Sequence, residues 1–406
     1  MPTATDPRRR RAVLRRLGRW LGTGSAVVAG GAGATIAGGV AGGAALGGAV
    51  VARTANATTA NAATAASRIA MFAAAWEQGG RYRAGLLAPA RLGAAFEPRV
   101  AIDLPTRAHG LFVEPDGRLL VIARRPGDWL LRFDPSGRTA PQWAWSDDET
   151  QCNGHVVRSA DGQRLFSTET VRDSGDGCIV VRDAATLAPL ARWPTGGRDP
   201  HELVVTADGA LWVANGGIET RPETGRVKHD LARMDSSLVR LDGVSGRIVG
   251  QWRLDDRRLG LRHLALHADG RVGIALQAEH EHDGVRRAAP VLAILDPRDG
   301  LVAVPLPAGV SGDGYGGSIA ATGDGFLVSC PRSNRILAFR QPPDRRWTTA
   351  ATLAEGCALA VADPAAAAWA GGVGAVVRIA AATSSPQRFA LDPAVRLDNH
   401  WVYVGR

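Results

Sequence analysis

The chain has 406 residues, of which 45% are apolar and 21% are charged, and its formal net charge is +9. This apolar content excludes a chain that is disordered throughout, and the charged fraction argues against a protein with many membrane-spanning segments. The length allows two or three ordinary domains or one large all-β domain, and the basic charge would indicate a nucleic-acid partner only if it were spread over the fold.

The N-terminus holds most of the basic charge. Residues 1–20 contain seven arginines and one aspartate, a net +6, and residues 21–52 carry no charge and are mostly Gly, Ala and Val. A basic segment followed by an uncharged apolar stretch is the pattern of an export signal. Arg10-Arg11, followed by an apolar pair and Arg15, also fits the twin-arginine pattern. We therefore expect a periplasmic or otherwise exported protein, with residues 1–57 as a twin-arginine signal peptide or an N-terminal anchor.

Two fates of this segment remain open. Cleavage would use Ala55-Asn56-Ala57, and the composition of the segment favours it. Retention as a membrane anchor is the alternative, because 32 uncharged residues exceed the roughly 20 needed to span a bilayer. A nucleic-acid-binding arm is disfavoured, since such arms are not followed by a long uncharged stretch. We expect no nucleic-acid partner, and membrane contact only through this segment if it stays uncleaved.

Residues 58–81, rich in Ala, Thr and Asn, are expected to form a linker or a short helix. The stretch 53–81 adds a net +2, so residues 82–406 are close to neutral. The basic charge therefore belongs to the N-terminal segments, and the folded domain is expected over residues 82–406.

A repeat of strand, Asp-Gly turn and strand recurs along this domain, and in its first four copies a histidine stands near the start of the first strand. These histidines are spaced by 46, 46 and 62 residues. The four copies begin at residues 109, 154, 200 and 262, two weaker copies begin at residues 317 and 356, and a single strand follows at 399–404. Four short strands per repeat with Asp-Gly hairpins are typical of a propeller blade.

These repeats predict an all-β fold, a seven-bladed β-propeller. Six copies and the single last strand make seven blades if N-terminal strands in residues 82–104 complete the seventh. Pairing of the N- and C-terminal strands in one blade would close the ring and remove its open edges. No segment of the domain shows a helical period, and we expect a monomer.

The innermost strand of each propeller blade lines the central channel, so the motif histidines are expected at one mouth of that channel. Polar side chains 14 residues after three of these histidines, at the end of the second strand, should return to the same mouth, as should Arg124. The expected set is His109, His155, His201, His263 and His400, with Glu169, Glu202, Asn215 and Gln277 near them.

Three interpretations of this set remain open. The residue types alone favour a structural role, in which each histidine bonds a neighbouring strand and determines how the blades pack. A metal site is the second, because imidazole suits Fe, Cu and Zn. A mouth that binds an organic ligand is the third.

The third copy carries the main insertion, which leaves from the histidine mouth and returns at Ser237. A long loop at a mouth can act as a lid or a ligand clamp, and a surface connection packed by its own side chains is the equal alternative. The insertion residues of interest are Gly216, Gly217, Ile218, Arg226 and Lys228. A second polar stretch, residues 279–284, alternates acids and histidines and is expected to be an exposed loop.

The remaining signals for chemistry are weak. No two of the four cysteines form a C-x-x-C pair, so neither a zinc pair nor a covalently attached haem is expected, and disulfide pairing cannot be assigned from the sequence. The chain also lacks the hydrolase, phosphate-loop and dinucleotide motifs.

Several short motifs occur together: His109-Gly110, Gly154-His155, Pro200-His201-Glu202, Asn215-Gly216-Gly217-Ile218, Arg262-His263 and Asp398-Asn399-His400. Across residues 82–406 this set resembles one bacterial family, catalogued as a domain of unknown function, number fifteen-thirteen. The chain departs from the family pattern at Lys228-His229-Asp230, where Lys-Leu-Asn is expected. The resemblance implies a twin-arginine-exported propeller encoded near imelysin-like proteins, with a role in iron acquisition and envelope iron-uptake proteins as partners.

Two functions follow from these observations. The first is a non-enzymatic binding protein for a metal, a metal complex or a protein partner. The alternative is a metal-dependent enzyme of the propeller lactonase or hydrolase kind, in which the metal polarises a carbonyl or activates water.

Overall fold

The structure is a computed structural model that describes residues 69–405, apart from 221–223, 225–226, 342–343, 364–366 and 381–384. The expected signal or anchor, residues 1–57, and the first part of the expected linker lie outside the described residues. None of the described helices is long and apolar enough to cross a membrane.

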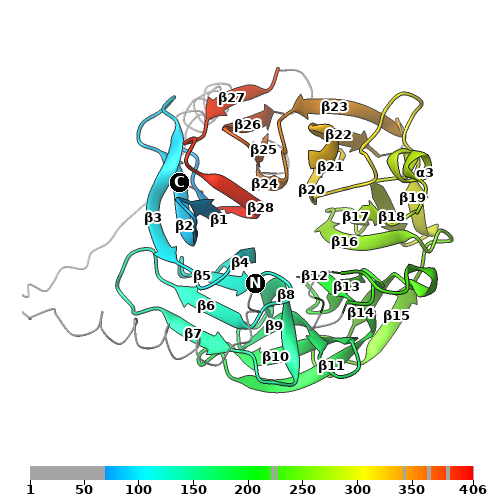
Figure 1. Ribbon diagram of the computed structural model, residues 1–406, viewed down its shortest axis with the longest axis horizontal. Helices are drawn as coiled ribbons and strands as arrows, with labels where there is room; N and C mark the ends of the chain where they lie inside the picture. Colours follow the sequence, from blue (N-terminus) through cyan, green and yellow to red (C-terminus); the bar gives the residue numbers. More distant parts are fainter. Residues whose placement is uncertain are drawn as a thin grey trace, which may run out of the picture. The chain divides into compact units, whose positions relative to one another are not determined.

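The described residues form seven four-stranded antiparallel sheets, which are the blades of a propeller (Figure 1). The innermost strands of neighbouring blades contact one another around the central channel. This arrangement confirms the predicted all-β, seven-bladed propeller. From the channel outward, blade one contains β4 (Ala108–Val113), β5 (Leu119–Ala123), β6 (Trp129–Phe133) and β7 (Gln142–Trp145). Blade two contains β8 (Thr150–Arg158), β9 (Arg164–Val171), β10 (Asp176–Asp183) and β11 (Pro189–Arg198). Blade three contains β12 (Pro200–Val205), β13 (Leu211–Asn215), β14 (Ser237–Leu241) and β15 (Ile248–Trp252).

The remaining blades follow the same pattern. Blade four contains β16 (Leu259–Leu266), β17 (Val272–Ala278), β18 (Leu292–Asp296) and β19 (Gly300–Val304). Blade five contains β20 (Ser318–Thr322), β21 (Gly325–Cys330), β22 (Arg335–Arg340) and β23 (Arg346–Thr352). Blade six contains β24 (Ala358–Asp363), β25 (Ala367–Gly372), β26 (Ala375–Ala380) and β27 (Gln387–Ala390). Blade seven contains β28 (Arg396–Tyr403), β1 (Phe72–Gln78), β2 (Arg81–Pro89) and β3 (Phe96–Asp103), so strands from both ends of the chain close the ring as predicted.

The closing blade begins earlier in the chain than expected. Strand β1 lies inside residues 58–81, so the expectation of a linker or short helix there is corrected for the residues from Phe72 onward. Its run of three alanines has a low β propensity and gives no local strand signal. Pairing with β28 and β2, together with the burial of Phe72 and Trp76, supplies the stability that the local sequence lacks. Phe72 stacks on Trp401 with ring centroids 4.0 Å apart and planes at 11°.

The Asp-Gly turns of the four main repeats behave as the pattern predicts. Their glycines have positive φ angles of 86°, 71°, 81° and 90° at Gly117, Gly162, Gly209 and Gly270. A left-handed backbone at this position matches the right-handed twist of the two strands that the turn connects. The turns therefore return each second strand to the mouth from which its first strand started.

Among the described residues, three short helical segments lie in the connections: α3 (Asp283–Ala288), η2 (Leu231–Arg233) and η3 (Pro331–Ser333). Helix α3 is too short to show a helical period in the sequence. Asp283 in its first turn and Arg286 and Arg287 in its last turn have the charges that favour a helix dipole. The stretch 279–284, expected to be an exposed loop, is therefore helical at its last two residues, Asp283 and Gly284, and its first residue, Glu279, is buried.

Candidate functional site

A β-bulge occurs at each of the five motif histidines. The register between the innermost strand and its neighbour shifts between Ala108 and Leu111, Cys152 and Val156, Pro200 and Leu203, Leu261 and His263, and Leu397 and Trp401. The innermost strand β20, which has no histidine, pairs with β21 without a shift. A bulge bends a strand locally and turns a side chain in a new direction. The innermost strand β24, which also has no histidine, shifts register only at its far end, between Val361 and Asp363.

The five imidazole rings lie in one compact group, here called the five-histidine cluster: His109, His155, His201, His263 and His400. Nine of the ten pairs of rings have centroid distances from 4.4 Å, between His263 and His400, to 6.0 Å, between His109 and His263; the tenth pair is His201 and His400. Four of the rings are buried and His400 is half-buried. The structure thus brings the five predicted histidines together.

Each ring of the cluster has a buried nitrogen that no described group bonds. These atoms are Nδ1 of His109, His201 and His263, and Nε2 of His155 and His400; the His263 atom lies 3.3 Å from Oε2 of Glu202 but outside hydrogen-bond geometry. The Nε2 atoms of His109 and His201 lie 3.4 Å apart and can share one proton. Buried polar atoms in folded proteins are nearly always bonded, so five unbonded nitrogens in one place require a ligand, an ion or ordered water.

Burial keeps the cluster in the neutral form. Desolvation lowers the pKa of His109, His155, His201 and His400 well below the ordinary value of 6.5. Desolvation, aided by the positive charge of Arg262, lowers the pKa of His263 to about 3. A neutral imidazole is the form that donates a lone pair to a metal ion.

The one predicted carboxylate that reaches the cluster is Glu202. Its Oε1 lies 3.6 Å from Nδ1 of His155, and its Oε2 lies 3.3 Å from Nδ1 of His263. Oε2 also accepts a hydrogen bond of 2.7 Å from the backbone N–H of Leu264. Burial raises the pKa of Glu202. The Glu202 side chain therefore contacts two of the rings, and its hydrogen bond to Leu264 links it to the neighbouring blade.

Two sets of three ring nitrogens are close enough to bind one metal ion. The sets are His109, His155 and His201, and His109, His263 and His400, and within each set the ligand atoms lie within 4.8 Å of one another. Metal–nitrogen bonds of about 2.0–2.1 Å in a tetrahedral site place two ligand nitrogens roughly 3.3 Å apart. The 3.4 Å between His109 and His201 fits this geometry. The residues therefore fit a transition metal such as Fe, Cu or Zn.

A small cavity of about 20 Å³ adjoins the cluster. It is lined by His109, Arg124, Arg125, Asn153, His201, Arg262, Tyr315 and Asn399. This volume holds about one water molecule. The cluster therefore has room for a small ligand beside it.

A buried ion triad beside the cavity was missed by sequence reasoning. The guanidinium groups of Arg125 and Arg262 both donate to Asp199, the second over 2.8 Å, and all three side chains are nearly inaccessible to solvent. The triad carries one net positive charge, since one carboxylate faces two guanidiniums. A signal was present in the chain, because Asp199 stands two residues before His201 and Arg262 directly before His263.

Three other predicted residues have hydrogen-bond partners of their own outside the cluster. Glu169 accepts hydrogen bonds from Arg182, Thr150 and Ser167. The amide nitrogen of Asn215 donates to the carbonyl of Thr195 and to Ser237.

Gln277 donates to Glu279 over 2.7 Å. Counting 14 residues from each histidine ignored the bulges, which add residues to the innermost strand. The pairing partners of Glu169, Asn215 and Gln277 are consequently Cys152, Pro200 and Gly260, all before the histidines.

The predicted insertion residues that the structure describes divide between close packing and an ion pair. Gly216 and Gly217 lie where a Cβ atom would meet Asp199 at 2.5 Å and the Ser236 backbone at 2.3 Å, so close packing requires glycine there. Ile218 is buried. Lys228 reaches out to form an ion pair with Glu279, whereas Arg226 lies outside the described residues.

The four cysteines are buried, free thiols. Burial raises the pKa of Cys178, Cys330 and Cys357 to about 12, and raises that of Cys152 further. The thiols are therefore protonated at neutral pH and take no part in the cluster.

Residues 102–404 match the family described as protein of unknown function (DUF1513). The chain belongs to this family. The match covers the whole propeller except its first strands, and it confirms the resemblance that the histidine motifs predicted. A search of curated proteins found no match.

Solved structures share the fold at low sequence identity. The periplasmic gluconolactonase of Pseudomonas aeruginosa is 15% identical, with a TM-score of 0.54, over 82% of this chain and 97% of that chain. Hydrazine synthase of Kuenenia stuttgartiensis is 14% identical, with a TM-score of 0.54, over 76% of this chain and 94% of that chain. At such identities the likeness is one of fold alone.

Proposed function

We propose that this DUF1513 protein is an exported, non-enzymatic binding protein that holds a transition metal ion, Fe, Cu or Zn, in the five-histidine cluster. The observation that carries the proposal is the convergence of neutral imidazoles, in which two sets of three ring nitrogens lie within 4.8 Å of one another in the described part of the chain. A purely structural cluster would use these atoms in bonds between blades, as Thr168 does with the His201 carbonyl. Metal coordination gives them partners of the right chemistry.

Export and a partner form the second part of the proposal. The arginine-rich segment followed by an uncharged stretch supports delivery to the periplasm by the twin-arginine route, either cleaved or anchored. Family resemblance supports a link to iron acquisition, with an envelope iron-uptake protein as the partner that receives or supplies the metal. Co-purification from envelope extracts, with and without mutation of the cluster, tests this part separately.

A metal-dependent lactonase or hydrolase is the second candidate. It is supported by the small cavity beside the cluster, where a metal-bound water could lie near Arg262. A periplasmic gluconolactonase has the same fold. The size of the cavity argues for the binding role, because about 20 Å³ holds a water molecule but not a lactone ring. If the protein hydrolysed members of a panel of lactones and esters, and a chelator abolished this activity, the enzyme would become the favoured candidate.

The test of the binding role is metal content and metal titration. The purified protein is stripped with a chelator and titrated with Fe(II), Cu(II) and Zn(II), and about one equivalent of a preferred metal is expected to bind. The double variant His109→Ala, His201→Ala breaks both sets of three ring nitrogens and should bind no metal at this site. His282→Ala is the control, because His282 is exposed and belongs to the acid- and histidine-rich stretch at α3.

The outcomes separate the interpretations. Loss of binding in the double variant and retention in the control support the cluster as the site. Equal loss in the control would assign the metal to the exposed stretch instead. Absence of titratable binding in the unmodified protein would overturn the proposal and favour a structural role for the histidines.

A further inference from the structure

A second pocket, of about 380 Å³, lies away from the five-histidine cluster. Its lining residues, here called the arginine pocket, are Lys228, Ala278, Glu279, Arg286, Arg287, Asp313 and Arg332. They come from connections of three successive blades: the insertion after β13, the β17–β18 connection with α3, the β19–β20 loop and η3. A volume of this size suits a small organic ligand.

The charge of the arginine pocket is positive. Four basic and two acidic side chains line it, a net +2. Both carboxylate oxygens of Glu279 are occupied, at 2.6 Å and 2.5 Å from Nζ of Lys228. Gln277 donates a further hydrogen bond of 2.7 Å to Glu279. The negative charge of Glu279 therefore neutralises Lys228 and does not neutralise the arginines on the opposite side of the pocket.

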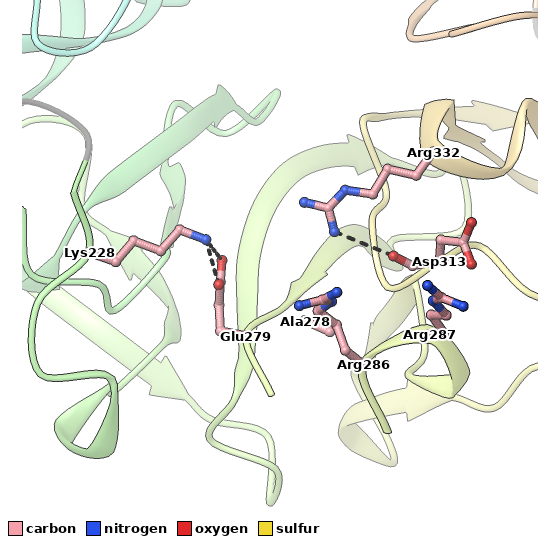
Figure 2. A pocket seen from close by; sticks show the side chains of 7 residues that line it. All are labelled: Lys228, Ala278, Glu279, Arg286, Arg287, Asp313 and Arg332. Carbon is pink, nitrogen blue, oxygen red and sulfur yellow. Dashed lines mark hydrogen bonds and ion pairs between the residues drawn. The ribbon is translucent and has the colours of Figure 1, made fainter. Parts of the chain in front are cut away.

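Two of the arginines have no carboxylate partner among the residues that the structure describes. Arg332 donates only to the backbone carbonyl of Asp313, over 3.4 Å, and its guanidinium lies 4.7 Å from the centre of the Tyr315 ring. Arg287 makes no ion pair with any described residue, whereas Arg286 pairs with the exposed Asp283 at 2.7 Å. Figure 2 shows the guanidiniums of Arg332 and Arg286 facing the Lys228–Glu279 pair across the opening.

The arginine pocket and the cavity beside the histidines are separated by single side chains. Tyr315 lines that cavity and lies against Arg332 of the pocket. Gln277 forms a backbone bridge with Tyr315 and bonds Glu279 of the pocket. The two sites thus share neighbours but no lining residue.

We propose that the arginine pocket binds a small oxyanion with at least two negative charges, such as a polycarboxylate or a phosphate compound. Guanidinium groups bond the planar oxygen pairs of carboxylates and phosphates in a bidentate manner, which a simple cation does not. Arg287 and Arg332 supply these donors, and stacking on Tyr315 holds the plane of Arg332. The Lys228–Glu279 pair forms the opposite wall and adds no net charge.

The site is independent of the metal proposed for the histidines, so it is tested on chelator-treated protein. Calorimetric titrations with citrate, inorganic phosphate and acetate at constant ionic strength compare two multivalent probes with a monovalent one. The double variant Arg287→Gln, Arg332→Gln removes both unpaired guanidiniums. Arg91→Gln is the matched control, since Arg91 is exposed in the β2–β3 loop and has no ion pair with a described residue.

Saturable binding of citrate or phosphate is expected in the unmodified protein and in the Arg91 variant, with acetate much weaker. The double variant should bind at least about tenfold more weakly, the effect of losing one charge-assisted hydrogen bond or more. Binding of citrate but not of phosphate would identify a carboxylate ligand. Binding of phosphate but not of citrate would identify a phosphate ligand. Unchanged affinity in the double variant with an unchanged melting temperature, or no saturable binding of either probe at millimolar concentration, overturns the proposal.

Discussion

The Nε2 atoms of His109 and His201 lie 3.4 Å apart, although 92 residues separate the two in the chain. They extend from the innermost strands of blades one and three, β4 and β12, which are not neighbours in the ring. His155, from the blade between them, lies with both rings at centroid distances of 4.9 Å and 5.1 Å. The rings therefore meet near the axis, where strands of several blades converge.

His109 should be the most important ligand of the cluster. It belongs to both sets of three nitrogens, whereas each of the other four histidines belongs to one. We expect His109→Ala to weaken metal binding by more than the roughly 10–100-fold typical of losing a supporting residue, and His400→Ala to have a smaller effect. Competition with a chromophoric chelator measures both. A larger loss in the His400 variant would contradict the central position of His109.

The metal-free protein should lose stability in mild acid. The folded pKa of the cluster histidines lies below the unfolded value of 6.5, so below that pH the unfolded chain binds more protons and the free energy of unfolding falls. For His263, with a folded pKa of about 3, the loss at pH 5 is roughly 2 kcal/mol. Glu202, whose pKa is raised, acts in the opposite direction and reduces the total.

Urea unfolding at pH 7.0, 6.0 and 5.0 measures this dependence. His263→Gln should flatten the curve because it removes one group that must stay neutral in the fold. An equally steep curve in that variant, or none in the unmodified protein, would show that His263 is not held neutral by burial.

Breaking the buried triad should destabilise the propeller. Asp199→Asn keeps the shape but leaves two buried guanidiniums without a carboxylate, which typically costs about 3–5 kcal/mol. Asp116→Asn, at an exposed ion pair with Arg118, is the control and should cost at most about 1 kcal/mol. Chemical denaturation of the two variants compares them. Similar small losses in both would mean that the triad does not hold the mouth together.

Closure of the ring should depend on β1. Phe72→Ala removes a fully buried ring stacked on Trp401 and should lower the free energy of unfolding by about 3–5 kcal/mol. Leu92→Ala is the control, because Leu92 is 64% exposed, and should change it by less than about 0.5 kcal/mol. A chain that begins at residue 69 should fold, whereas one that begins at residue 82 should not melt cooperatively. Normal melting of the shorter chain would show that β1 is dispensable.

The cysteines should be unreactive in the folded state. All four are buried, and burial raises the pKa of three of them to about 12, so the thiolate is scarce at neutral pH. A thiol reagent should label none of them in native buffer and all four in denaturant. Rapid labelling of the native protein would place a thiol at the surface.

The repeat of histidine, strand and Asp-Gly turn was enough to predict seven blades, the closure of the ring and the convergence of five histidines. It sufficed because hairpins at regular spacing have few ways to bury their faces other than side by side around an axis. The Asp-Gly turns also require positive φ angles, and the glycines in the sequence indicate where these occur. Local rules could not show β1, whose alanines become a strand only through pairing with β28.

Which residues form each site was decided by tertiary structure. A bulge at each histidine shifts the pairing, so Glu169, Asn215 and Gln277 bond other partners while Glu202 stays beside the cluster. The arginine pocket joins connections from three blades, and no sequence spacing links Arg287 to Arg332. The chain by itself determined the ring and the residues that face its axis. Only folding decided which of them keep a free nitrogen or an unpaired charge, because hydrogen bonds and ion pairs depend on distances between segments far apart in the sequence.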